Sequence, residues 1–265
     1  MPFAEFGGVP TYFEIHGAGP AIVFVHGGGG NTLSWFNQIP HFVDRYTSIN
    51  VDLRTFKHSI CPFELYHPKF FADDVLAVLD YLGIKRAAFA CQSLGAWAAL
   101  PLAVRHSERV ACLAISSSPT PAYSPSNWAL LERAIHSAVD KQRGRPDQFL
   151  AQGFNPEFAA KHPERMFLYE ALSRLNGKRN SPLMADESCK LYPVEFEHYA
   201  TPTLIMGGEH DLFLTPQSHH HVASLIPGAE VHTFEHSGHH PYWEEPAEFN
   251  RVLDAFLVKN GWLGL

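Results

Sequence analysis

Residues 86–98 read RAAFACQSLGAWA, an apolar run that is interrupted at Gln92-Ser93-Leu94-Gly95 and then resumes. The run over 86–91 predicts a buried strand, and residues 94–106 predict a helix with a kink at Pro101. Ser93 falls on the turn between them, where its hydroxyl is available as a nucleophile. An ordinary loop serine fits this short stretch equally well, so the other segments have to decide.

The segments on both sides of this turn alternate between strand and helix patterns. Helical spacing of apolar residues predicts helices over 69–82 and 246–261, the latter with Pro near its start and Gly at its end. Continuous apolar runs predict further strands over 21–27, 47–54, 109–117, 202–208 and 230–234. This alternation predicts an α/β fold with a mainly parallel sheet flanked by helices.

Residues 120–199 depart from the alternation, because they contain helical patterns and no convincing buried strand. They fall between two predicted strands, so we expect a helical cap inserted over one end of the sheet. The predicted organisation is therefore a core formed by residues 1–119 and 200–265, with a cap formed by residues 120–199.

Composition narrows the classes of partner. The 265 residues carry a formal net charge of −7 and are 46% hydrophobic, which argues against a nucleic-acid or membrane partner. No apolar run reaches the roughly 18 residues needed to span a bilayer, and the first residues do not resemble a signal peptide. The four cysteines lack paired spacing, as expected for free thiols in a reducing compartment. We expect a cytoplasmic protein with a small-molecule substrate; monomer and homodimer stay open.

Polar residues with catalytic chemistry follow several predicted strands. Ser93 comes after the strand at 86–91, Asp211 after the strand at 202–208, and His239 after the strand at 230–234. Parallel strands present their carboxyl ends at one edge of the sheet, where ligands bind. A nucleophile, an acid and a base thus reach this edge in the chain order Ser, Asp, His.

Five motifs together resemble the α/β-hydrolase superfamily over nearly the whole chain outside the cap. His26-Gly27-Gly28 resembles the oxyanion loop, and VDLRTFKHS (51–59) resembles an Asp-x-Arg-Gly-x-Gly-x-Ser turn. CQSLG (91–95) resembles the nucleophile elbow. GGEHD (207–211) resembles the acid loop, and HSGHHPYWEEPAEFN (236–250) resembles the base loop with its trailing helix.

The resemblance implies a role for each candidate. Ser93 would be the nucleophile, His239 the base that takes its proton, and Asp211 the group that orients His239. The backbone N–H groups of Gly28 and Leu94 would form the oxyanion hole. This chemistry needs neither a metal nor an organic cofactor.

Neighbouring residues offer alternatives to these assignments. His236 and His240 flank the candidate base, but Gly238 directly precedes His239, as in the family's Gly-His pair. Glu209 lies slightly too early in its loop to replace Asp211.

Two further groups are interpreted as structural. Asp52 and Arg54 are expected to form an ion pair beneath the oxyanion loop. Consecutive helical residues point in different directions, so His219, His220 and His221 are expected to form a solvated helix face rather than a metal site.

The chain departs from the family pattern at three notable positions. Thr55 and Lys57 replace the two glycines of the Asp-x-Arg turn, so the backbone path there could differ and Lys57 could add charge at the rim of the site. Cys91 replaces the elbow's first glycine, although it is expected to belong to the strand rather than to act as a nucleophile.

Apolar residues of the cap predict the character of the substrate. Pocket candidates are Trp35, which lies close to the oxyanion loop, and the cap residues Trp128 and Phe167. The cap also contains Tyr123, Phe149, Phe154, Phe158, Met166, Leu168 and Tyr169. They favour an uncharged hydrophobic or aromatic carbonyl compound, although Arg133, Arg165 or Arg174 could bind a carboxylate.

The leading hypothesis is a serine hydrolase that cleaves an ester, lactone or thioester through an acyl-enzyme. One alternative is a C–C bond hydrolase, or a non-hydrolytic relative that uses the His-Asp dyad as a base. Another is a ligand receptor with the same fold, because fold alone does not determine function.

Overall fold

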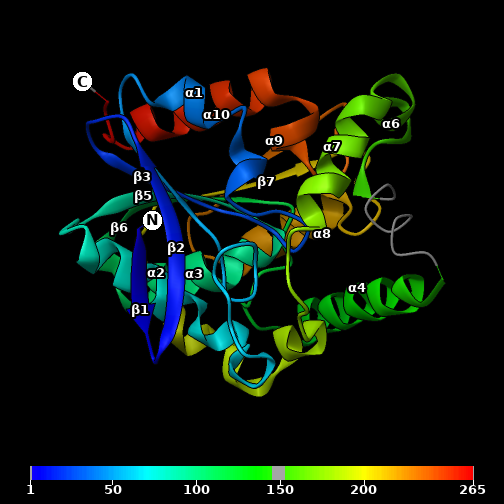
Figure 1. Cartoon of the computed structure of the whole chain (residues 1–265), viewed down its shortest axis with the longest axis horizontal. Coiled ribbons are helices and arrows are strands. Elements are labelled where there is room, and N and C mark those ends of the chain that lie inside the picture. Colours follow the sequence, from blue (N-terminus) through cyan, green and yellow to red (C-terminus); the bar gives the residue numbers. More distant parts are fainter. Residues whose placement is uncertain (1, 145–152, 265) are drawn as a thin grey trace.

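The computed structural model describes residues 2–144 and 153–264. Its described part contains one eight-stranded sheet in the order β1-β2-β4-β3-β5-β6-β7-β8 (Figure 1). β1 pairs antiparallel with β2, and β2 pairs antiparallel with β4, whereas the other neighbours are parallel. The strands are β1 (Phe3–Phe6), β2 (Val9–His16), β3 (Ala21–Val25), β4 (Thr47–Val51), β5 (Ala87–Gln92), β6 (Val110–Ser116), β7 (Thr203–Gly208) and β8 (Glu230–Phe234).

Helices cover both faces of the sheet. One face carries α2 (Phe71–Tyr81), α3 (Ala96–Arg105) and α8 (Pro216–Ser224), and the other carries α1 (Ile39–Phe42), α9 (Pro241–Glu244) and α10 (Pro246–Lys259) (Figure 1). Successive strand side chains alternate between two apolar clusters: Val23 packs in one and Phe24 in the other. Burial on both faces explains why these strands read as continuous apolar runs.

The predicted α/β fold is confirmed, and its strands and helices lie within a few residues of the expected bounds. The hairpin of β1 and β2 was not predicted. Its strands mix buried and exposed side chains, so they lack the continuous apolar signal, and Gly7 and Gly8 with positive φ form the turn between them.

Residues between β6 and β7 form a group of helices beyond one end of the sheet (Figure 1). They are α4 (Pro125–Gly144), α6 (Pro156–Lys161) and α7 (Pro163–Ser173), followed by short 3₁₀ turns at Ser181–Ala185, Glu187–Cys189 and Pro193–Phe196. No strand is present in the described part of this segment, only an isolated bridge between Ala122 and Leu191. The division of the chain into two domains at 119 and 200 stays a prediction.

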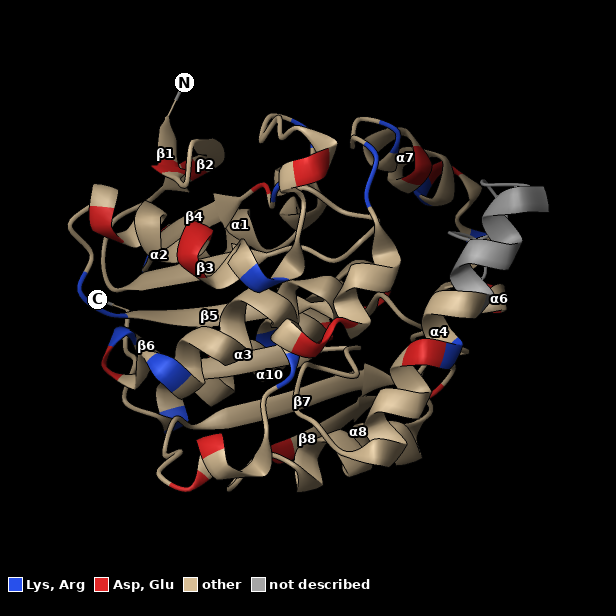
Figure 2. Ribbon diagram, turned by 90° about the horizontal axis from the view of Figure 1, so that it is seen from below, with Lys and Arg blue, Asp and Glu red and all other residues tan. Residues whose placement is uncertain are grey.

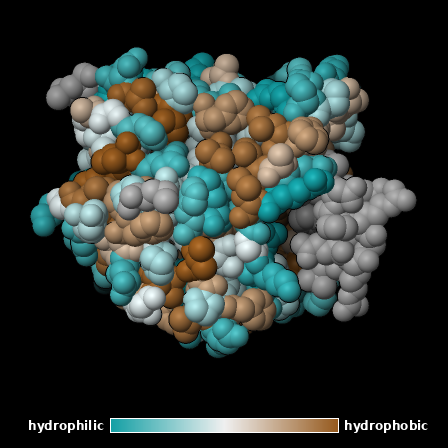
Figure 3. Space-filling model, viewed as in Figure 1, coloured by the Kyte–Doolittle hydropathy of each residue, from teal (hydrophilic) through white to brown (hydrophobic). Residues whose placement is uncertain are grey.

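Neither charged nor apolar residues are confined to one region in the two views that show them. Acidic and basic residues are scattered over helices and loops (Figure 2), and apolar and polar side chains intermingle on the face seen in Figure 3. Over residues 2–144 and 153–264, no helix combines the length and apolar character that a membrane crossing requires.

Candidate active site

Ser93 lies on a strained turn at the carboxyl end of β5. Its φ is +47°, a conformation that non-glycine residues rarely adopt and that is often found at functional sites. The chain then enters α3, and a Cβ on Gly95 would lie 2.5 Å from the backbone oxygen of Val25. Gly95 therefore lets the elbow pack tightly against β3, which explains the Ser-x-Gly pattern.

His239 and Asp211 form a hydrogen-bonded pair. The distance from His239 Nδ1 to Asp211 Oδ2 is 2.7 Å, and the other carboxylate oxygen accepts the backbone N–H groups of Phe213 (2.8 Å) and Leu214 (3.1 Å). Burial alone would raise the pKa of Asp211, but the charge of His239 and these hydrogen bonds outweigh burial and lower it. Asp211 is thus held as an acceptor for the imidazole.

The backbone around His239 is fixed from two directions. Gln92 Nε2 donates to the His239 carbonyl at 3.1 Å. On the other side, Glu244 Oε1 accepts the N–H groups of Gly238 (3.0 Å) and His240 (3.1 Å). Burial raises the pKa of Glu244 to about 7. These contacts attach the base loop both to the elbow and to α9.

Ser93 and His239 line the same cavity, whose volume is about 130 Å³. Gly28 and Leu94, the candidates for the oxyanion hole, line it as well. The remaining described wall is largely apolar and is formed by Gly29, Gln92, Pro119, Leu131, Ala134, Ile135, Gly153, Tyr169, Arg179, Ser181, Met184, Phe213, Leu214 and His240. All four residues are therefore close enough to share one ligand.

The alternative histidines occupy different environments. The His236 side chain is exposed, whereas His240 is buried against Phe154 and Tyr169. Burial lowers the pKa of His240 well below its ordinary value, so its ring is neutral. Among these three histidines, His239 is the one whose ring contacts Asp211 in the described hydrogen-bond network.

The three pocket candidates do not line the described cavity wall. Trp35 is fully buried between Phe24 and Tyr242, and Trp128 packs against Tyr123.

The third pocket candidate, Phe167 on the cap helix α7, does not line the described cavity wall. Phe167 is 71% exposed, whereas Tyr169, two residues later, lines the cavity. Positions two apart differ by about 200° around a helix. Of the other cap candidates, Phe149 lies outside the described residues.

Arg179 is a charged residue of the described cavity wall that the sequence analysis missed. It belongs to no regular helix, so no periodic pattern singles it out, although Gly177 and Pro182 mark its surroundings as a loop. The arginines considered instead are elsewhere: Arg174 is 71% exposed beside Glu170, and Arg165 donates to the Trp243 carbonyl. Arg133 is exposed.

The expected ion pair between Asp52 and Arg54 is wrong. Arg54 instead pairs with Asp74 at 2.6 Å, and both side chains are buried. Asp52 accepts the backbone N–H groups of Thr32 (2.7 Å) and His58 (3.3 Å). β4 ends at Val51, so residues 52 and 54 no longer share a strand face and their side chains diverge.

The expectation of a solvated face at 219–221 is also wrong in part. His219 is fully buried beneath β7, where burial lowers its pKa to about 4, whereas His220 is exposed. In the part of the chain that the structure describes, no cluster of three or more His, Cys, Asp or Glu side chains could hold a metal ion.

The family departures are accommodated without losing the loop conformation. Thr55 and Lys57 both keep positive φ values, 71° and 41°, the region that glycine adopts most easily. Lys57 Nζ donates to Thr32 Oγ1 at 2.9 Å and lies 3.5 Å from Glu14. The Lys57 ammonium group is thus held by Thr32 and Glu14.

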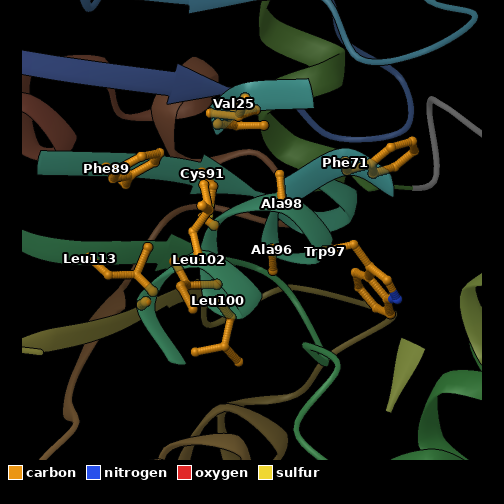
Figure 4. Close-up of a cluster of buried hydrophobic side chains, with 14 of the residues drawn as sticks. Val25, Phe71, Phe89, Cys91, Ala96, Trp97, Ala98, Leu100, Leu102 and Leu113 are labelled. Atoms are coloured by element: carbon orange, nitrogen blue, oxygen red, sulfur yellow. The ribbon is translucent and has the colours of Figure 1, made fainter. Parts of the chain in front are cut away.

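Cys91 belongs to β5 and is buried in an apolar cluster with Val25, Phe89 and Leu102 (Figure 4). Burial raises the pKa of its thiol, which disfavours the reactive thiolate.

Comparison with known proteins identifies the family of the fold. The sequence model of the alpha/beta hydrolase fold matches residues 20–246. The chain is 26% identical to a 2-hydroxymuconate semialdehyde hydrolase from Pseudomonas sp. (strain CF600), over 95% of this chain and 92% of that protein. It is 26% identical to an uncharacterized carboxylesterase from Bacillus subtilis (strain 168), over 91% and 81% respectively. Among solved structures, Est816, described as an N-acyl homoserine lactone degrading enzyme, matches with a TM-score of 0.83 and 29% identity, over 96% of this chain and all of that one. The chain belongs to the α/β-hydrolase fold family.

Proposed function

We propose that this protein is a serine hydrolase that cleaves an ester, lactone or thioester of a small molecule through an acyl-enzyme. The observation that carries the proposal is the 2.7 Å contact between His239 and Asp211 in a base loop whose histidine shares a cavity with Ser93. Similarity to proteins described as a carboxylesterase and as a lactone-degrading enzyme supports this class of reaction.

The proposed reaction assigns one role to each of these residues. Ser93 Oγ attacks the substrate carbonyl while its proton passes to His239 Nε2, and Asp211 stabilises the resulting imidazolium. The N–H groups of Gly28 and Leu94 stabilise the oxyanion, and one such donor is typically worth about 2.7–4 kcal/mol of barrier. Collapse expels the alcohol or thiol, which takes the proton from His239. Water then attacks the acyl-enzyme with His239 as base and releases the acid and Ser93.

The test uses p-nitrophenyl esters of increasing acyl length with the wild type and Ser93→Ala. We expect wild-type turnover, a burst of p-nitrophenol in the first turnover, and loss of both in the variant. Ser224→Ala is the matched control, because Ser224 is exposed at the end of α8. Equal rates in wild type and Ser93→Ala would reject the acyl-enzyme.

A second candidate is hydrolysis of a C–C bond, favoured by the similarity to the 2-hydroxymuconate semialdehyde hydrolase. In that case a vinylogous diketone would be cleaved faster than any p-nitrophenyl ester. Comparing kcat/KM for both substrate classes separates the two candidates.

A further inference from the structure

Among the described residues of the cavity wall, one carries a charged side chain. Arg179 is the only Lys, Arg, Asp or Glu among the described lining residues. Among the side chains of residues 2–136 and 153–264, no carboxylate forms an ion pair with its guanidinium. Its Cζ lies 5.7 Å from the centroid of the Phe56 ring. Burial lowers the pKa of Arg179, which means that the cation is held where water solvates it poorly.

Arg179 lies directly beside the oxyanion loop. Its Nη1 donates to the Gly28 carbonyl oxygen, and a Cβ on Gly28 would lie 3.6 Å from the guanidinium carbon. A guanidinium carries five N–H donors in one plane, so the bond to Gly28 leaves others available. The cation is therefore within about one residue length of the N–H group assigned to the oxyanion hole.

The segment that carries Arg179 is fixed to the core by Thr55. The Gly177 N–H donates to the Thr55 carbonyl at 2.7 Å, and Thr55 Oγ1 donates to the Lys178 carbonyl at 2.8 Å. A Cβ on Gly177 would lie 2.7 Å from the Thr55 carbonyl oxygen, so this close approach requires glycine. Thr55 thus places the residues immediately before Arg179.

A second pair of side chains fixes the same segment to the oxyanion loop. Asn176 Nδ2 donates to the Gly30 carbonyl at 3.0 Å, and Asn31 Nδ2 donates to Asn176 Oδ1 at 3.1 Å. These contacts fix the chain directly before Arg179, and the hydrogen bond to Gly28 fixes its guanidinium, so the cation is preorganised to bind a partner charge.

We propose that Arg179 binds a carboxylate of the substrate, so that the preferred substrates are small esters or lactones that carry a carboxylate a few bonds from the reacting carbonyl. Planar N–H pairs of arginine match a carboxylate geometrically and electrostatically. The apolar remainder of the wall contacts the carbon chain between the two groups. This inference rests on the proposed function, and it replaces the uncharged substrate expected from the sequence.

The test compares methyl esters of equal acyl chain length, of which one ends in a carboxylate and its partner ends in a methyl group. Monomethyl succinate is paired with methyl butyrate, and monomethyl glutarate with methyl pentanoate, with hydrolysis followed by pH-stat. The readout is the ratio of kcat/KM for the anionic ester to that for its neutral partner. Taking this ratio within one protein cancels any general loss of activity caused by movement of Gly28.

We expect Arg179→Gln to lower the ratio roughly 10- to 150-fold, the range for a hydrogen bond to a charged group. Arg179→Lys should retain part of it, because it keeps the charge but loses the planar donors. Thr55→Val, which removes the hydrogen bond to Lys178, should lower the ratio less. Arg174→Gln is the control and should leave the ratio unchanged, since that side chain is exposed. If Arg179→Gln leaves the ratio of the two kcat/KM values unchanged, Arg179 only holds Gly28 in place, and the proposal is overturned.

The experiments distinguish failure of the carboxylate site at Arg179 from failure of the proposed serine hydrolase activity. If wild type hydrolyses neutral p-nitrophenyl esters in a Ser93-dependent way but Arg179→Gln leaves the ratio intact, only the carboxylate site is rejected. If no ester is hydrolysed, calorimetric binding of monomethyl glutarate to Ser93→Ala still tests the site. Binding that is weakened at least tenfold by adding Arg179→Gln supports it, and equal binding rejects it.

Discussion

Asp211→Asn is a sharp perturbation of the proposed mechanism, because the structure dictates how the new amide must sit. One carboxylate oxygen of Asp211 accepts two backbone N–H groups, and the other faces His239 Nδ1. The asparagine side chain has only one oxygen, and this oxygen takes the position that accepts the two backbone N–H groups. The NH₂ group then faces His239, so Nδ1 must become an acceptor and the ring proton moves to Nε2. In that tautomer His239 cannot take the proton of Ser93.

The expected loss follows from the same distance. At a separation of 2.7 Å and an effective dielectric constant of about 20, the attraction between the carboxylate and the imidazolium is about 6 kcal/mol. The same substitution in Ser-His-Asp proteases lowers kcat about 10⁴-fold, which corresponds to about 5.4 kcal/mol. We therefore expect kcat of Asp211→Asn to fall by roughly four orders of magnitude.

The assay measures kcat with p-nitrophenyl butyrate and the size of the first-turnover burst. Thermal unfolding of each protein confirms that the variant is folded. Glu209→Gln is the matched control, because Glu209 lies in the same loop but is exposed, and its kcat should stay within about twofold of wild type. A folded Asp211→Asn variant with kcat within tenfold of wild type would refute the assigned role of Asp211.

Two stability predictions concern buried carboxylates outside the reaction itself. Glu244→Gln should flatten the pH dependence of the unfolding free energy. Burial raises the pKa of Glu244 from 4.5 to about 7, so between these pH values the folded wild type holds a proton that the unfolded chain has released. The unfolding free energy of the wild type therefore falls by up to about 3 kcal/mol as pH rises through this window. Urea titrations at several pH values check this, and parallel curves for wild type and variant would contradict it. Asp74→Asn should lower stability by about 3–5 kcal/mol, or roughly 10 °C in Tm, because it leaves Arg54 buried without its 2.6 Å partner; a calorimetric Tm within 2 °C of wild type would count against it.

The parts of the site that sequence reasoning predicted are those set by local pattern. Ser93 and Asp211 follow strands that are buried along their whole length, whereas His239 follows the partly buried strand β8, and all three strands were predicted from the sequence. Their carboxyl ends meet at one edge of the sheet because parallel strands share a direction. Topology alone therefore brings these three residues near one another.

The parts that sequence reasoning missed depend on packing between distant segments. Arg54 finds its partner Asp74 on α2 rather than the nearby Asp52, because the chain turns after β4. The cavity-facing side of α7 depends on how that helix docks, so Tyr169 and not Phe167 lines the cavity. No periodicity in a single segment contains this information.

At Thr55, a local sequence pattern and packing between distant segments both determine the structure. The family pattern has glycine at this position because the turn needs a positive φ, and Thr55 keeps the positive φ of 71° despite its β-branched side chain. Such strain persists only where surrounding contacts compensate for it, and here the contacts are those to Gly177 and Lys178, directly before Arg179. One of the residues that depart from the family pattern thus helps to fix the segment that carries Arg179. The motifs of the α/β-hydrolase family accordingly support the proposed reaction, whereas the proposed substrate class is inferred from residues outside those motifs and from departures such as Thr55.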